Sequence, residues 1–154
     1  MQSKIRNSAK AIIVRDGHML VLVKGDVNGK EFYILPGGGQ NFGETLHEAL
    51  HRECIEEIGA KIEIRNLVCI REYIGRNHEF AESDGNAHQV EFMFVCELKD
   101  GQQPETGILP DSKQIGVKWI PLTDLPTAPF YPAALRTVIS QLSSHSRMYL
   151  GDVN

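Results

Sequence analysis

Residues 38 to 60 read GGQNFGETLHEALHRECIEEIGA, two glycines followed by a segment with three closely spaced glutamates in its second half. Glu53, Glu56 and Glu57 stand at i, i+3 and i+4, so on a helix they project from one face as neighbours. Three like charges at this spacing destabilise a helix unless a positive charge neutralises them. Hard divalent cations bind oxygen ligands of this kind, and magnesium commonly shares substrate phosphates. The stretch therefore predicts a metal and phosphate site on a helix.

The expected helix has recognisable ends. It begins at Glu44 or Thr45, continues to about Ile58 and stops at Gly59. Residues 37–39 are three glycines, which predict a turn before the helix because only glycine allows such a run of unusual backbone angles.

The rest of the chain predicts mainly strands. Asp16-Gly17 is a strong hairpin signal between two apolar runs. The expected strands are 9–15, 19–24, 32–35, 62–74 (one long strand or a bent pair), 89–98 and 116–120. A closing helix is expected at 132–142, loops at 75–87 and 100–113, and a frayed tail after residue 145. This order favours an α/β sandwich with a mixed sheet.

Residues 38–60 also resemble the Nudix box. That pattern is Gly, five residues, Glu, seven residues, Arg-Glu, an aliphatic residue, any residue, Glu-Glu, any residue, Gly and an aliphatic residue. Cys54 and Ala60 fill the aliphatic positions, and Cys54 is acceptable because an unpaired Cys behaves as a small hydrophobe. The fixed positions are all matched in register: Gly38, Glu44, Arg52, Glu53, Glu56, Glu57 and Gly59.

The resemblance implies a fold and a reaction. The implied fold is the Nudix-type α/β/α sandwich with a central mixed β-sheet, as one domain over residues 1–154. Nudix hydrolases cleave a nucleoside diphosphate linked to another moiety, with Mg²⁺ or Mn²⁺ as cofactor. Bound cations neutralise the pyrophosphate charge and make a water acidic enough to attack.

The resemblance also assigns roles by position. Glu53, Glu56 and Glu57 match the metal-binding glutamates, and the carbonyl of Gly37 matches a further metal ligand. Arg52 is expected to hold a carboxylate in place, with Glu44 as its partner. Gly38, Glu44 and Gly59 are structural positions of the motif. The general base stays open, with these candidates: Glu53, Glu79, Glu82, Asp84, Glu91, Glu97 and Glu105.

Two other functions compete with this interpretation. His47, Glu48 and His51 form the His-Glu-x-x-His signature of zinc peptidases. On a helix these histidines lie on a different face from Glu53, so the two motifs cannot build one site. The other alternative is a non-catalytic nucleotide-sensing module on the same fold, which has no need of intact glutamates.

Candidate substrate contacts lie outside the box. Arginines can clamp phosphates with paired hydrogen bonds, and aromatic rings can stack on a base. The candidates are Arg71, Arg76, His78, Phe80, Phe130 and Tyr131. The marker Pro or Tyr that some Nudix subfamilies carry about 15 to 18 residues beyond the box is absent from residues 74–77, so the substrate stays open.

Composition limits the class of protein. The chain has 154 residues, of which 42% are apolar and 23% charged, as in an ordinary globular domain. A net charge of -4 argues against nucleic acid as a partner and leaves a small nucleotide-like diphosphate, bound through a metal. Cys54, Cys69 and Cys96 lack paired spacing, so reduced cysteines and a cytoplasmic location are expected. No signal peptide or membrane span is predicted, and a homodimer is possible.

Overall fold

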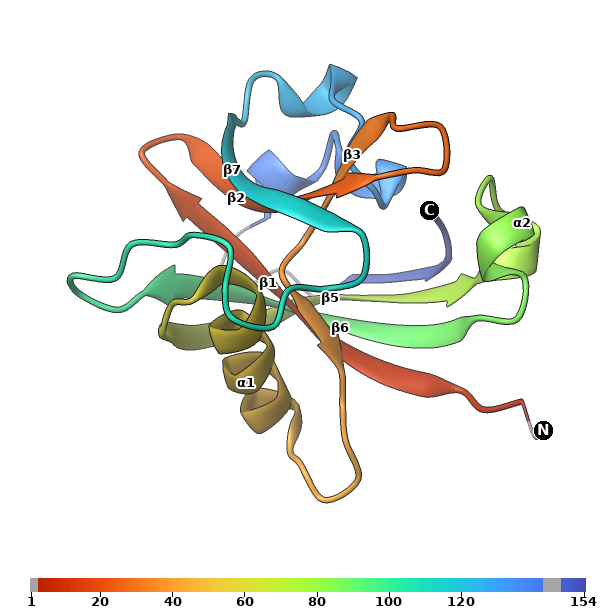
Figure 1. Ribbon diagram of the computed structural model, residues 1–154, viewed down its shortest axis with the longest axis horizontal. Helices are drawn as coiled ribbons and strands as arrows, with labels where there is room; N and C mark the ends of the chain where they lie inside the picture. The colour runs from red at the N-terminus through yellow and green to blue at the C-terminus, as the bar shows by residue number, and fades with distance from the viewer. Residues whose placement is uncertain (1–2, 143–147) are drawn as a thin grey trace.

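Within residues 3–142 and 148–154, which the computed structural model describes, eight strands join into one sheet arrangement. The strands are β1 (Arg6–Arg15), β2 (His18–Gly25), β3 (Glu31–Ile34), β4 (Gly37–Gly39), β5 (Ile62–Ile74), β6 (His88–Leu98), β7 (Gln114–Pro121) and β8 (Met148–Asp152). Their order is β3-β2-β1-β6-β5-β8, with β4 paired to β1 and β7 paired to β2 (Figure 1).

The sheet is mixed, as predicted. β1 runs parallel to β6, β6 runs antiparallel to β5, and β5 runs parallel to β8. β1 and β2 form the predicted hairpin, and both Asp16 and Gly17 have positive φ, which matches the twist of a tight hairpin. The long β1 belongs to both halves of the arrangement and therefore ties β2, β3 and β7 to β5 and β6 (Figure 1).

The longest helix of the described residues, α1, spans Leu46–Ile58. The side chain of Thr45 accepts a hydrogen bond from the backbone of Glu48, whose side chain in turn accepts one from Thr45, which is a capping box. Gly59 ends the helix in the left-handed conformation that glycine adopts without strain. No helix within the described residues is long and apolar enough to cross a membrane.

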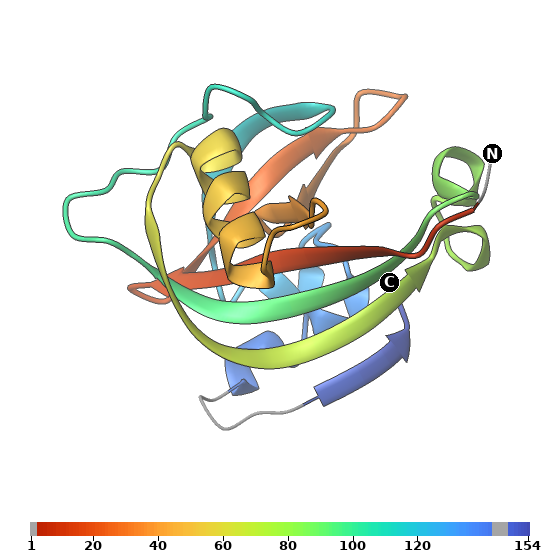
Figure 2. The same cartoon turned by 90° about the horizontal axis from the view of Figure 1, so that it is seen from below.

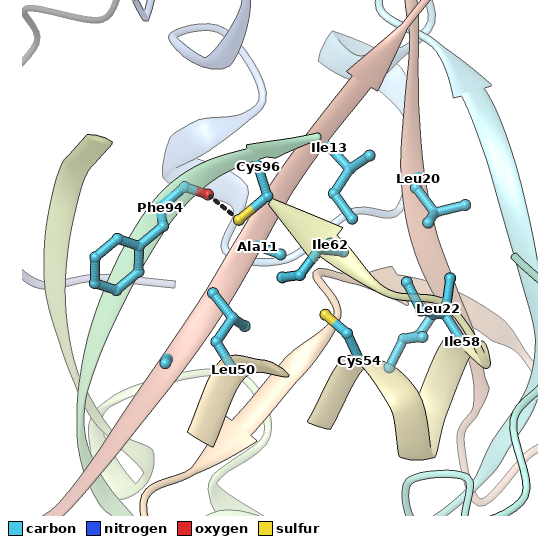
Figure 3. Packing of buried hydrophobic residues seen from close by; sticks show 12 residues of the cluster. Ala11, Ile13, Leu20, Leu22, Leu50, Cys54, Ile58, Ile62, Phe94 and Cys96 are labelled. Carbon is cyan, nitrogen blue, oxygen red and sulfur yellow. Dashed lines mark hydrogen bonds between the residues drawn. The ribbon is translucent and has the colours of Figure 1, made fainter. Parts of the chain in front are cut away.

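Two hydrophobic clusters cover the two faces of the sheet, because alternate residues of a strand point to opposite faces. The first lies under α1 and includes Leu50, Cys54 and Ile58 from the helix with Ala11 and Phe94 from the strands (Figure 3). The second lies on the opposite face and includes Phe130, Leu135 and Ile139. Figure 2 shows α1 on one side of the sheet and the C-terminal segments on the other. Cys54, Cys69 and Cys96 are buried and free, as predicted.

The structure corrects three predictions. Residues 37–39 form strand β4 beside β1 and not a turn. Residues 132–142 contain only the single 3₁₀ turns η3 (Ala133–Leu135) and η4 (Ile139–Gln141), because the segment includes the run Thr-Val-Ile-Ser at 137–140, which has low helix propensity. The tail predicted to fray after residue 145 forms β8 from Met148, since the edge of β5 offers unpaired backbone groups; residues 143–147 lie outside the described residues.

Three more short elements complete the fold. The predicted loop 75–87 contains η1 (Gly75–Asn77) and the one-turn helix α2 (Ala81–Asp84), which lies beyond the end of β5 (Figure 1). The third is η2 (Leu125–Thr127), after β7. In Figure 1, α2 lies at the right-hand end of the sheet, whereas α1 lies below the sheet.

Candidate active site

Arg52 is the centre of the polar network on α1. Its Nε and Nη2 donate to the two carboxylate oxygens of Glu44 at 2.6 and 3.0 Å, a paired contact that fixes both side chains. Its Nη1 donates to Glu53 at 2.9 Å and to Glu56 at 3.3 Å, and its Nη2 also donates to the carbonyl of Gly39 at 2.9 Å. The hydrogen bonds to Arg52 lower the pKa of Glu44 to about 2. The contact expected between Arg52 and Glu44 is therefore present.

Glu57 is the buried carboxylate of the helix. Only 2% of the residue is exposed, and its Oε1 accepts a hydrogen bond from the backbone N–H of Gly37 at 2.7 Å. Burial raises the pKa of Glu57 to about 8, although the charge of Lys10 and the bond from Gly37 act in the opposite direction. A carboxylate with so little solvation is stabilised in its charged form by a cation placed beside it.

The glycines of β4 are required by the close approach of their neighbours. A Cβ on Gly37, whose φ is +127°, would lie 2.1 Å from the carbonyl oxygen of Ala9. A Cβ on Gly38 would lie 2.7 Å from the carboxylate of Glu53. The carboxylates of Glu53 and Glu57 therefore both lie against β4, one beside Gly38 and the other on the N–H of Gly37.

These oxygen atoms suit a hard divalent cation. The donor set expected to hold Mg²⁺ or Mn²⁺ is Glu53, Glu56, Glu57 and the carbonyl of Gly37. In the structure Glu53 and Glu56 pair with Arg52, and the carbonyl of Gly37 accepts a hydrogen bond from Lys10 at 3.1 Å. Among residues 3–142 and 148–154, no three His, Cys, Asp or Glu side chains are grouped closely enough to form a complete metal site. The donors are thus of the right chemistry and adjacent to one another, but each has an internal partner.

The predicted loop at 100–113 supports the end of α1, a contact that the sequence did not indicate. The N–H groups of Glu105, Gly107 and Leu109 donate to the carbonyls of Ile58, Glu57 and Glu56, and the side chain of Gln114 also donates to the carbonyl of Glu57. These are carbonyls that a helix leaves unsatisfied at its C-terminus. A Cβ on Gly107 would lie 2.2 Å from the carbonyl oxygen of Glu56, so the contact requires glycine. The loop therefore fixes the backbone that carries the glutamates.

A cleft of about 840 Å³ lies on the face of the sheet opposite α1. Lys10 of β1, Arg71 of β5 and Glu91 of β6 contribute to its lining, and none of the described lining residues is a glutamate of α1. The rings of Phe32, Phe80 and Tyr131 line the cleft as well, together with Asp26, Tyr73, Glu79, Glu82, Asp84, Asp111 and Asn154. Of the candidates for the general base, Glu79, Glu82, Asp84 and Glu91 line this cleft, whereas Glu97 pairs with Arg65.

Arg71 is 6% exposed and all of its nitrogens are engaged. Its Nε and Nη2 donate to the carboxylate of Glu91 at 2.8 and 3.1 Å. Its Nη1 donates to the carbonyl of Val153 at 2.7 Å and to the side chain of Asn154 at 3.0 Å. Burial alone would raise the pKa of Glu91, but the charges of Arg71 and Lys10 and the hydrogen bonds from Arg71 together outweigh burial and leave the pKa below its ordinary value. Arg71 therefore lines the cleft as one half of a buried ion pair and not as an exposed clamp.

The structure separates the other substrate candidates. Phe130 is fully buried in the second hydrophobic cluster, so its assignment as a base-stacking residue is wrong. The next residue, Tyr131, does line the cleft, with its ring 4.9 Å from that of Phe80 and 6.1 Å from that of Phe32. Arg76 is exposed and is not among the lining residues.

His78 also lies outside the cleft lining. Its Nε2 lies 2.6 Å from the carboxylate of Asp152, and its ring stacks on that of Tyr73 at 5.5 Å. The histidine therefore connects η1 to β8 and does not face the cleft.

The His-Glu-x-x-His motif has no site geometry. Glu48 is used in the capping box, and the ring of His47 packs edge-on against Phe94 at 5.2 Å. Burial, with the charges of Lys99 and His47, lowers the pKa of His51. Glu48 and His47 are thus engaged in contacts within the helix and the core and do not converge with His51 on a common site.

Comparison with known proteins agrees with this geometry. The model of the NUDIX domain matches residues 4–142. The chain is 29% identical over 119 residues to the NAD-capped RNA hydrolase NudC of Chromobacterium violaceum, covering 77% of this chain and 41% of that protein. It is 26% identical over 91 residues to the ADP-ribose pyrophosphatase of Methanocaldococcus jannaschii, covering 59% of this chain and 50% of that protein. The chain thus spans half or less of these relatives.

Solved structures show the same fold. The MutT NUDIX hydrolase from Burkholderia pseudomallei is similar with a TM-score of 0.67 and 25% identity, covering 86% of this chain and 95% of that one. A NUDIX hydrolase from Nitrosomonas europaea gives a TM-score of 0.70 at 17% identity, covering 89% of this chain and 87% of that one. With the family model matching residues 4–142 and the box residues assembled on α1 and β4, the chain belongs to the Nudix hydrolase family.

Proposed function

We propose that this chain is a divalent-metal-dependent pyrophosphohydrolase that cleaves the diphosphate bond of a nucleoside diphosphate linked to another moiety. The observation that carries the proposal is the position of Glu53 and Glu57. Both carboxylates lie against β4, while Arg52 donates hydrogen bonds to Glu53 and Glu56 and to the Gly39 carbonyl of β4. A charged network of this density on one helix face is costly without a cation, and a diphosphate substrate needs the same cation.

Each residue of the network has a task in this reaction. Glu53, Glu56, Glu57 and the carbonyl of Gly37 would hold Mg²⁺ or Mn²⁺, which neutralises phosphate charge and activates a water when bound. Arg52 orients the carboxylates, because its planar guanidinium contacts three of them and the carbonyl of Gly39 at once. Glu57 is held rigidly by the N–H of Gly37 and by the loop that caps the end of α1.

The cleft supports a nucleotide-like substrate. Its volume of about 840 Å³ is within the range of pockets that bind small organic ligands. The rings of Phe32, Phe80 and Tyr131 offer a place for a flat base, because aromatic rings bind bases by stacking. The names of the relatives, an NAD-capped RNA hydrolase and an ADP-ribose pyrophosphatase, point to nucleotides with a diphosphate as the first substrates to test.

A substrate panel tests the proposal. Purified protein would be incubated with ADP-ribose, NAD, nucleotide sugars, nucleoside triphosphates and NAD-capped RNA, each with Mg²⁺, with Mn²⁺ and with EDTA. We expect metal-dependent release of a nucleoside monophosphate, or of another product of diphosphate cleavage, from at least one compound. Binding of these compounds without any hydrolysis would favour the nucleotide sensor, and zinc-dependent peptide cleavage would favour the peptidase.

A further inference from the structure

Lys10 lies at the junction between the glutamates of α1 and the cleft. Its backbone pairs with Gly37 of β4 on one side and with Met93 of β6 on the other. Its side chain is half-buried and lines the cleft. Its Nζ donates a hydrogen bond of 3.1 Å to the carbonyl oxygen of Gly37. This carbonyl is the one expected to bind the metal, so the ammonium of Lys10 and a metal ion would share one oxygen atom.

The backbone N–H and the carbonyl of Gly37 bind groups of opposite charge, a carboxylate and an ammonium. Its N–H donates to the carboxylate of Glu57 at 2.7 Å, and its carbonyl accepts from the ammonium of Lys10. Glu57 and Glu91 are both no more than 5% exposed, and the positive charge of Lys10 opposes the rise that burial causes in the pKa of each carboxylate. Glu91 also has Arg71 as a partner, whereas no salt bridge is formed by Glu57 within the described residues. Lys10 is therefore linked to Glu57 through the peptide groups of Gly37 and not by a direct ion pair.

We propose that Lys10 is an internal counter-ion of the metal site, which holds the Gly37 carbonyl in place through its hydrogen bond and competes with the metal for that oxygen. This inference rests on the proposed metal-dependent function. The physical reason is that two cations next to one carbonyl repel each other, so each weakens the binding of the other. Lys10 and the metal should consequently be antagonistic in their effects on stability.

Thermal unfolding in EDTA and in saturating Mn²⁺ tests this antagonism. The variants are Lys10→Met, which removes the ammonium, and Lys10→Gln, which keeps a hydrogen-bond donor without the charge. Lys118→Met is the matched control, because Lys118 is exposed and its ammonium lies 5.3 Å from the ring of Tyr33, outside the cleft lining. For each protein, the Tm in EDTA and the rise in Tm that Mn²⁺ causes are measured. Direct titration with Mn²⁺ gives the affinity.

We expect both Lys10 variants to have a lower Tm than the wild type in EDTA and a larger rise in Mn²⁺. Their Mn²⁺ affinity should be roughly tenfold tighter, which corresponds to about 1.4 kcal/mol. In a domain of this size that adds about 3 to 5 °C to the rise. Lys118→Met should show the wild-type rise.

Two results would overturn the proposal, and they distinguish the failure of the role of Lys10 from the failure of the metal site. A wild-type rise with an equal or smaller rise in both Lys10 variants would refute the role of Lys10 and leave the metal-dependent function intact. The absence of any Mn²⁺ effect in the wild type would refute the metal site itself, and with it both proposals. Lys10→Gln keeps the test decisive if Lys10→Met does not fold.

Discussion

The α1–β4 region and the cleft are built by different means. In the α1–β4 region, the charged groups lie within about twenty residues of one another in the chain, and Arg52 alone contacts Glu44, Glu53 and Glu56. The cleft instead collects residues from the whole chain, from Lys10 of β1 to Asn154. We infer that the first region determines the reaction and the second the substrate, so a change in either should alter a different kinetic constant.

The largest expected effect comes from Glu57→Gln. The change keeps the size of the side chain and an acceptor for the Gly37 N–H but removes the charge that would bind the metal. We expect kcat to fall about a thousandfold, since metal chemistry contributes several kcal/mol to such reactions. The measurement is steady-state hydrolysis on the best compound of the panel.

His51→Ala is the control for Glu57→Gln on the same helix, and it should retain near-normal activity. Glu57→Gln should also remain folded, and above about pH 8 the metal-free variant should unfold at a higher temperature than the wild type, because a buried charge has been removed. Normal turnover in Glu57→Gln would remove this residue from the metal site.

Arg52→Lys should have the next largest effect. A lysine keeps the positive charge but cannot contact Glu44 with two parallel hydrogen bonds while also reaching Glu53 and the Gly39 carbonyl. We expect a loss of about 10- to 100-fold in kcat, typical of residues that orient metal ligands. Its KM should change little, and a change confined to KM would show that Arg52 binds substrate and does not position the carboxylates.

Phe80→Ala tests the other side of the comparison. Loss of one stacking ring should raise KM about tenfold, since stacking contributes about 1–3 kcal/mol per base, and kcat should change much less. Phe42→Ala is the matched control, because Phe42 is fully exposed and is not among the lining residues. A fall in kcat with unchanged KM would mean that the two regions are not separable.

The smallest expected effect is the pH dependence of metal binding. The pKa of Glu57 is raised to about 8, so below that pH a proton competes with the metal for this carboxylate. The affinity for Mn²⁺ should therefore rise about fivefold between pH 7 and pH 8 and level off above about pH 9. Titration by calorimetry measures it, and an affinity that is level across this range would contradict a raised pKa.

Local features were the ones that sequence reasoning predicted well. The N-cap of α1 at Thr45 and its end at Gly59 follow from local spacing, and the contact between Arg52 and Glu44 is the one that the family resemblance implied. The closing helix at 132–142 was wrong because the segment has a Pro near its start but β-branched residues within it. Phe130 and Tyr131 are adjacent in the chain, yet one is in the core and the other in the cleft.

The sequence by itself determined the glutamate face, the helix that carries it and the family to which the chain belongs. Only the tertiary structure decided that Lys10 occupies the Gly37 carbonyl, that Arg71 is tied to Glu91, and where the cleft lies. The physical reason is one of distance along the chain. A helix face repeats every three to four residues and is visible in a short window, whereas the pairing of β1 joins it to residues of β4 that are 27 to 31 positions away and to residues of β6 that are 83 positions away.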